Sequence, residues 1–528
     1  MWTLLILSIL ILVFYYKLIK PLSHWKDRGV AHRRPLPIFG NFSSIAFRRK
    51  SFFDFTEQLY RDFENERYFG VHMFTKPALY IRDLDLVKKI TVKDFDQFTD
   101  HNKMIPDGVE PLMEKNLFNL KGQRWRDMRA TLSPSFTGSK MKMMFRLLSE
   151  CAEEVTKYLQ KQNESALHVD IKDIFTRFTN DAIASIAFGV ECNSLENKSN
   201  EFYTMGKRAT NIGGFRFFLF SLYQMVPVMA KILRLSFFPS SVSNFFYRLI
   251  KETMSRRAKE GFVRPDMIHL LLEARKGNEI QELEDSVDSG FATAKEHKIH
   301  YGDKKRSLKL SDEDITAQAL IFFFAGFETS STLMSFMAYE LALNSDVQKK
   351  LQNEIDETLT NCQGKLTYEA LYKMKYMDMV VSETLRKWPP GFHLDRVCVQ
   401  SYTIDPINLD EKPLTLEKGD MVLIPVVGIH HDPKYYTNPN KFDPERFSDE
   451  NKHTIQAFSY MPFGSGPRNC IASRFALMEN KILMFHLLSK FDVFPIGKTP
   501  VPITIAKGTL NFVPDVGFWL GLKQRNPN

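Results

Sequence analysis

A loop of glycines and prolines that leads to one cysteine constrains this chain more than any other stretch. Residues 462–472 read Pro-Phe-Gly-Ser-Gly-Pro-Arg-Asn-Cys-Ile-Ala, and an amphipathic helix is predicted from about Ala472 to Lys490. A helix start favours negative charge, so the thiolate of Cys470 is expected to be stabilised. We predict a metal site with one thiolate ligand, as in a haem iron held by one cysteine. A buried, unreactive cysteine is the alternative for this residue taken alone.

The composition is that of a large globular protein. The chain has 528 residues, of which 44% are hydrophobic and 25% charged, so it can enclose a cofactor. Its 45 Phe and 22 Met suit an apolar pocket, and equally an ordinary large core. The net charge is +9, without a basic run interleaved with aromatic residues that would indicate nucleic-acid binding. A mildly basic surface suits anionic lipid or an acidic protein partner.

The cysteines are few and scattered along the chain, at Cys151, Cys192, Cys362, Cys398 and Cys470. No C-x-x-C pair or Cys/His cluster indicates zinc. The pattern predicts a reduced compartment and no structural disulfides.

The amino terminus is apolar and is followed by basic residues. Residues 2–16 are nearly all apolar, and six Lys and Arg lie between Lys17 and Arg34. A cleaved signal peptide fits poorly, because the basic n-region and the small-residue cleavage site are missing. We predict an uncleaved membrane anchor over residues 1–20, with its amino terminus lumenal and the bulk of the chain cytosolic.

Three further boundaries are expected. Residues 21–41 form a basic linker and a proline-rich hinge, in which Pro35 and Pro37 stiffen the chain. Residues 42–528 form a single catalytic domain, and residues 277–309 within it are an exposed polar connector.

Helical periodicity dominates the rest of the chain. It predicts helices over residues 52–63, 84–92, 122–132, 139–161, 169–188, 266–274, 315–343 and 376–388. Strands are expected over residues 399–404 and 421–427, and hairpins over residues 68–82 and 503–510.

The longest predicted helix carries residues that conflict with helix propensity. Ser311 is its expected N-cap, and Ala325-Gly326-Phe327-Glu328-Thr329 lies in its middle. Such conflicts are typical of functional sites. We predict that Gly326 leaves space above a flat cofactor, that Thr329 hydrogen-bonds dioxygen or its water, and that Glu328 relays protons. Without Cys470, a kinked helix with a satisfied threonine would be the better interpretation.

Two further motifs place arginines on helix faces. Trp125 and Arg129 are four residues apart and share a face, where arginine suits a buried carboxylate; a basic surface helix is the alternative. Glu383 and Arg386 can pair in the same way, and Arg446 can complete a Glu–Arg–Arg cluster. We assign this cluster a structural role.

Together these motifs resemble the cytochrome P-450 superfamily. The cysteine loop matches F-x-x-G-x-R-x-C-x-(G/A), and residues 325–329 match A-G-x-(D/E)-T. The order of the hinge, W-x-x-x-R, A-G-x-E-T, E-x-x-R, P-E-R-F and cysteine motifs is the family's, so the resemblance spans essentially the whole chain. Residues 266–277 and 469–479 look like insect microsomal members that handle xenobiotics. Ala472 stands where glycine is commoner, and we expect its methyl group to be tolerated.

The resemblance implies the cytochrome P-450 fold (α+β), mostly α with a small β-rich subdomain from both chain ends and a single amino-terminal anchor helix. It implies haem b with Cys470 as the iron ligand, and NADPH electrons delivered by a membrane-bound diflavin reductase, with cytochrome b5 as a second candidate partner. Basic residues near Arg129 and Lys142 are candidates for docking. The cofactor-binding residues implied are Trp125, Arg129, Gly326, Arg396, Phe463, Arg468 and Cys470.

The implied reaction is a monooxygenation at the endoplasmic reticulum membrane. One oxygen atom enters a lipophilic molecule such as an insecticide, plant toxin or terpenoid, and the other leaves as water with protons passed by Glu328 and Thr329. The candidate pocket residues are Ile105 to Met113, Phe215 to Phe220, Phe322, Phe392, His393 and Thr509.

Two other functions remain open from the sequence. A haem-thiolate isomerase or dehydratase would act without a reductase, although a proton relay for dioxygen argues against it. A non-enzymatic membrane-anchored helical protein would use Cys470 structurally.

Overall fold

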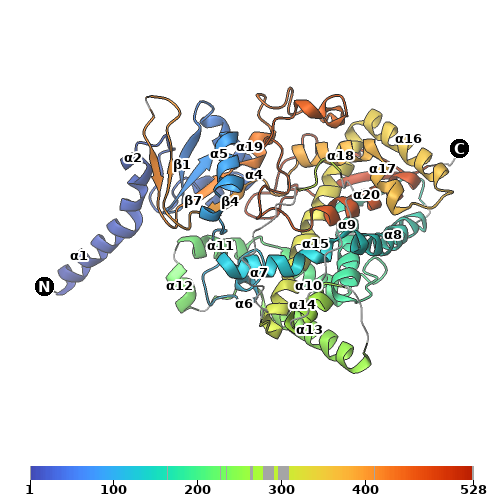
Figure 1. Ribbon diagram of the computed structural model, residues 1–528, viewed down its shortest axis with the longest axis horizontal. Helices are drawn as coiled ribbons and strands as arrows, with labels where there is room; N and C mark the ends of the chain where they lie inside the picture. Colours follow the sequence, from blue (N-terminus) through green and yellow to red (C-terminus); the bar gives the residue numbers. More distant parts are fainter. Residues whose placement is uncertain are drawn as a thin grey trace.

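The structure is a computed structural model. It describes residues 2–162, 164–225, 227–233, 235–261, 266–276, 290–294, 309–409 and 411–525. Most of the predicted polar connector, residues 277–309, lies outside these ranges. Figure 1 shows α1 projecting from one end of the molecule, beside a sheet, while helices make up most of the remainder.

The chain is mainly helical, as expected. The helices are α1 Trp2–Phe14, α2 His24–Asp27, α3 Ser43–Ala46, α4 Phe52–Asp62, α5 Leu84–Lys88, α6 Pro111–Glu114, α7 Gly122–Leu132, α8 Gly138–Gln160, α9 Ile171–Ile183, α10 Glu201–Thr210, α11 Phe215–Met225, α12 Pro227–Ile232, α13 Ser240–Glu260, α14 Met267–Lys276, α15 Asp312–Leu343, α16 Ser345–Asn361, α17 Tyr368–Lys373, α18 Lys375–Lys387, α19 Val426–His430 and α20 Ser473–Lys490. The strands are β1 Tyr68–Met73, β2 Lys76–Ile81, β3 Leu167–Asp170, β4 Leu394–Val397, β5 Tyr402–Ile404, β6 Leu414–Leu416, β7 Met421–Ile424, β8 Phe491–Phe494 and β9 Trp519–Gln524.

The main sheet joins early and late parts of the chain. Its order is β1-β2-β7-β4. The predicted hairpin forms, with β1 antiparallel to β2 and Tyr68 opposite Ile81. Strand β7 runs parallel to β2 and antiparallel to β4, so the 394–424 region completes a sheet begun before residue 82.

Two local predictions were wrong. The helix expected over residues 169–188 begins only at Ile171, because residues 167–170 form β3 and pair with β9 near the carboxyl terminus. Residues 503–510 form no continuous β-strand. They double back irregularly instead, with Ile505 bridged to Pro514 and the Ala506 N–H donated to the Val513 carbonyl at 2.8 Å.

Helix α15 is the central element. The Ser311 hydroxyl accepts from the Asp314 N–H, and the Asp314 side chain accepts from the Ser311 N–H, so the predicted N-cap is a complete capping box. The helix packs against α9, α10, α13, α18 and α20. Among the described residues it alone has the length and hydropathy of a membrane span, but 61% of its most apolar window is buried, so it is a core helix.

The amino-terminal helix is shorter than the predicted anchor. Helix α1 has 13 residues, and a π-helical turn, Tyr15–Ile19, continues it. Large apolar side chains of α1, including Trp2, Leu4 and Ile11, are exposed. This length does not establish a membrane-spanning anchor.

The predicted linker and hinge are docked on the main sheet. Trp25 is 1% exposed, and its Nε1–H donates to the Val71 carbonyl at 2.9 Å. A Cβ at Gly70 would lie 2.3 Å from the Trp25 ring, so only glycine admits this indole against β1. In the hinge, Leu36 and Gly40 exchange backbone hydrogen bonds of 2.8 Å. The segment therefore belongs to the folded body.

Candidate active site

The cysteine loop is held by its own backbone. The Cys470 N–H donates to the Phe463 carbonyl at 2.9 Å, and the Gly464 N–H donates to the Met461 carbonyl at 3.1 Å. Gly466 has φ +74°, and a Cβ there would lie 1.7 Å from the Thr91 carbonyl oxygen. The glycine is therefore required both by its φ angle and by the close approach of another backbone segment.

Cys470 has accessible surface although it is surrounded by protein, and most residues around it are buried or half-buried. Burial by the surrounding protein raises the pKa of this thiol, and the Ala472 N–H and Arg129 oppose the rise. The expectation that the helix start alone would stabilise the thiolate was wrong, because desolvation outweighs it. A bound metal ion reverses this balance, since a coordinating thiol is deprotonated.

Helix α7 brings Trp125 and Arg129 to this loop. The Arg129 guanidinium donates to the Asn469 carbonyl and to its side-chain Oδ1, both at 2.8 Å. Trp125 is 1% exposed, and the Arg468 guanidinium lies 4.0 Å from the centre of its ring. The two residues do share a face, and that face supports the cysteine loop.

Two buried arginines lie beside the loop. Arg468 donates from Nε to the Thr99 carbonyl at 2.7 Å and from its NH2 group to the Leu120 carbonyl at 2.6 Å. Arg396 is 1% exposed and donates to the Ser465 carbonyl at 3.3 Å, but its buried Nε has no partner. Burial lowers the pKa of Arg396 to about 10, with Asp395 opposing the change. An anionic group would satisfy the orphaned donor.

Two residues in the middle of helix α15 are exposed. Ala325 and Thr329 are exposed although most of this helix is buried, and four residues of spacing put them on one face. The Thr329 hydroxyl donates to the Ala325 carbonyl at 2.6 Å. The helix therefore presents a small side chain and a hydroxyl together.

Glu328 forms an ion pair with α9. Its Oε1 lies 3.2 Å from Nζ of Lys172 on α9, and the same ammonium donates to the Ser331 hydroxyl at 2.7 Å and the Thr332 hydroxyl at 2.8 Å. Burial lowers the pKa of Lys172, and Glu328 opposes the change. The carboxylate is thus committed to a half-buried ion pair between two helices.

Gly326 lies where α15 packs against α9. The position of its absent Cβ lies 2.8 Å from Cδ1 of Ile183 on α9. The glycine allows α9 and α15 to pack closely, so the space it leaves is already filled by protein. Contact between Gly326 and a cofactor remains a prediction.

The Glu383 cluster forms as expected. Glu383 and Arg386 are fully buried and joined by two hydrogen bonds, of 2.7 and 2.8 Å. The Asp443 N–H donates to Glu383 at 2.9 Å, and Nε of Arg446 lies 3.5 Å from it. The carboxylate therefore fastens α18 to the segment before the cysteine loop.

Some candidate pocket residues pack against other aromatic rings, and those in α11 are partly buried and partly exposed. Phe322 stacks on Phe136 with ring centres 5.7 Å apart, and Phe392 lies 4.8 Å from the His393 ring. In α11, Phe217, Leu219 and Phe220 are buried, whereas Phe215 and Phe218 are 71% and 57% exposed. The segment over residues 215–220 thus has one face directed into the protein and one directed outward.

Glu479 is a notable residue that sequence reasoning missed. It lies in the middle of α20, is fully buried, and neither carboxylate oxygen has a hydrogen-bond partner. Burial raises its pKa to about 8, with the nearby Ser330 hydroxyl opposing the rise. The available signal was the polar run Glu479–Lys481 inside an otherwise apolar helix.

These features fit an anionic cofactor with a metal that takes one sulfur ligand. The donor set offers one exposed thiol, a buried arginine with an orphaned Nε, and a helix face bearing Ala325 and Thr329. The class defined by this fold and site is the haem-thiolate proteins.

Comparison with known proteins gives the family. The family described as Cytochrome P450 matches residues 31–515. Cytochrome P450 9e2 of Blattella germanica is 47% identical over 542 residues, covering 99% of this chain and 98% of that protein. Probable cytochrome P450 9f2 of Drosophila melanogaster is 42% identical over 513 residues, covering 95% of each. Cytochrome P450 6k1 of Blattella germanica is 36% identical, covering 95% of this chain and 93% of that protein.

The chain belongs to the cytochrome P450 family. It is therefore a haem-thiolate monooxygenase, an oxidoreductase whose cofactor is haem with a cysteine thiolate ligand. Family members receive their electrons from NADPH through a reductase. The comparisons do not support the isomerase or dehydratase alternative.

Proposed function

We propose that this protein inserts one oxygen atom of O2 into a lipophilic foreign molecule, such as an insecticide, plant toxin or terpenoid. The observation that carries the proposal is the exposed Cys470 thiol combined with the exposed Ala325–Thr329 face on an otherwise buried helix. The haem, when bound, supplies the activation of dioxygen. Apolar side chains such as Phe322 and Phe392 favour a lipophilic substrate.

The proposed haem contacts follow the geometry of the loop. Cys470 is the iron ligand, and Phe463, whose carbonyl accepts from the Cys470 N–H, lies against the same cofactor. Arg396 binds a propionate through its unpartnered Nε. Arg468, Trp125 and Arg129 would hold the loop beside the propionates, and Gly326 would contact the cofactor from α15.

Thr329 and Glu328 are the proposed catalytic residues. Thr329 holds a proton at Oγ1 on the exposed face of α15, and its bond to Ala325 fixes the direction of the hydroxyl. Glu328 supplies protons from the α9 side, where Lys172 determines the position of its carboxylate. Lys172 acts through Glu328 and is a positioning residue.

The proposed location is the endoplasmic reticulum membrane. Residues 1–20 form the anchor, residues 21–41 the linker and hinge, and residues 42–528 the cytosolic catalytic domain, with a polar connector over residues 277–309. Exposed Phe215 and Phe218 on α11 and Val228 and Ile232 on α12 support a second contact with lipid.

NADPH-cytochrome P-450 reductase is the proposed electron donor, and cytochrome b5 a second partner. The proposed docking surface lies on the cysteine side near Lys142, which is half exposed and lies 2.9 Å from Glu369. Arg129 stabilises the cysteine loop on this side, because its guanidinium donates a hydrogen bond to the Asn469 carbonyl.

Two measurements test the function. The reduced protein with carbon monoxide is expected to show a thiolate-type Soret band, and without that band the haem-thiolate assignment fails. Substrate turnover is then measured with and without NADPH and the reductase. Turnover that needs neither would refute the monooxygenase proposal in favour of an isomerase or dehydratase.

A further inference from the structure

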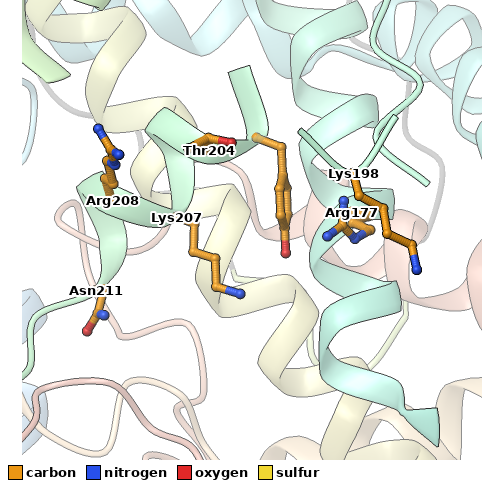
Figure 2. Close-up of a pocket in the computed structure, with 7 residues that line it drawn as sticks. Arg177, Lys198, Thr204, Lys207, Arg208 and Asn211 are labelled. Carbon is orange, nitrogen blue, oxygen red and sulfur yellow. The ribbon is translucent and has the colours of Figure 1, made fainter. Parts of the chain in front are cut away.

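A basic pocket lies between α9 and α10, and none of its lining residues belongs to the candidate active site. Its volume is about 380 Å³. The lining residues are Arg177, Lys198, Tyr203, Thr204, Lys207, Arg208 and Asn211. Figure 2 shows Lys207 extending from α10 toward the side from which Arg177 of α9 approaches.

Of the four cations that line this pocket, Arg177 and Lys207 share one carboxylate. Asp173 lies 2.9 Å from Nε of Arg177 and 3.8 Å from Nζ of Lys207. Among the described residues, Lys198 and Arg208 have no acidic partner within 4.0 Å. The Arg177 guanidinium also donates a hydrogen bond to the Ser194 carbonyl, which fixes its position. The pocket therefore keeps an excess of positive charge that its own side chains do not neutralise.

Capping of α10 does not account for this charge. Basic residues in a last turn commonly interact with the free carbonyls of a helix end. Here Arg216 of α11 already donates to the carbonyls of Arg208, Ala209 and Asn211. Among the described residues, Arg208 thus has neither a carboxylate nor a helix end as its partner, and Lys207 has the 3.8 Å contact with Asp173.

We propose that this pocket binds an anionic phosphate group. Arg208, Lys207 and Lys198 supply charge-assisted contacts to phosphate oxygens. The Thr204 hydroxyl and the Asn211 amide offer neutral donors. Arg177 and Lys207 lie 4.1 and 5.9 Å from the centre of the Tyr203 ring, which also lines the pocket.

An anion held there would fasten α10 to α9. The end of α10 is tied to the turn that contains Thr509, because the Leu510 N–H donates to the Ile212 carbonyl at 3.1 Å and Asn511 Nδ2 donates to the Thr210 carbonyl at 3.0 Å. An anion that reduces the motion of α10 would therefore also reduce the motion of that turn. The link from the turn to substrate rests on the proposed function, whereas binding of the anion does not.

The test is calorimetric titration of the detergent-solubilised holoenzyme with inorganic pyrophosphate at constant ionic strength. The wild type is expected to bind pyrophosphate, and Lys207→Gln with Arg208→Gln is expected to weaken binding at least tenfold. The matched control is Lys251→Gln with Arg256→Gln, which removes the same charge from exposed positions of α13. Binding by the control is expected to equal that of the wild type.

The outcomes are distinct. No binding of pyrophosphate or of a short-chain phosphatidic acid overturns the proposal. Equal weakening in both double variants also overturns it, because the attraction then arises from the net charge of +9. Binding of phosphatidic acid alone, lost only in the pocket variant, supports the site and assigns its phosphate to a lipid. Binding of pyrophosphate is also expected to slow the exchange of amide hydrogens in α10.

Discussion

Replacement of Glu479 by glutamine should stabilise this protein progressively as the pH rises from 6 to 8. Glu479 is fully buried without a hydrogen-bond partner, and burial raises its pKa to about 8 from a usual value of 4.5. Its acid form is therefore retained in the folded protein while the unfolded chain ionises. Because the unfolded state loses its proton first, folding stability falls as the pH rises between these two pKa values.

The magnitude follows from the two pKa values. Between pH 6 and pH 8 the wild type loses about 2 kcal/mol through this one carboxyl, and Glu479→Gln does not. An unfolding entropy of about 2.1 cal/mol/K per residue makes this a difference of about 2 °C in Tm for a chain of 528 residues.

The assay is thermal unfolding of wild type and variant side by side at pH 6, 7 and 8, at one scan rate. Other titrating groups contribute equally to both proteins and cancel in the difference. Glu252→Gln, at an exposed position of α13, serves as the control and should show no pH-dependent gap. A constant difference between wild type and Glu479→Gln across this range would refute the reasoning.

The remaining predictions concern the haem side. Cys470→Ser should fold but show no thiolate-type Soret band with carbon monoxide, and a normal band would exclude Cys470 as the ligand. Glu383→Ala should lose about 3–5 kcal/mol of stability by leaving the buried Arg386 unpaired, and should fail to incorporate haem; normal haem content would overturn its structural role. Gly326→Ala should lower Tm, because the added methyl group would crowd Ile183. Ile183→Val in the same chain should restore Tm. If Tm stays low in the double variant and the Soret band shifts, Gly326 contacts the haem instead.

Local signals were sufficient for several elements. The capping box at Ser311 and the shared face of Trp125 and Arg129 depend on residues three or four apart, so periodicity alone predicts them. The cysteine loop is likewise local, because its glycines and the Cys470–Phe463 hydrogen bond lie within eight residues.

Long-range contacts explain the failures. Residues 167–170 became strand β3 because a partner more than 300 residues away supplied the ladder bonds. Contacts between helices are also set by distant residues: Glu328 pairs with Lys172, and Gly326 lies against Ile183, both of α9. The pKa of Cys470 was misjudged because the helix-start effect is local, whereas desolvation is set by the entire fold.

The docking of Trp25 against Gly70 has a practical consequence for shortening this enzyme. The indole, its bond to Val71 and the contact between the His72 ring and the Pro21 carbonyl make residues 21–30 a covering layer of the main sheet. A chain cut just before Pro21 keeps this layer and removes only the exposed apolar helix. A chain cut at the proline-rich segment would instead uncover a strip of β1 shaped for an indole, and would invite aggregation along that new apolar surface.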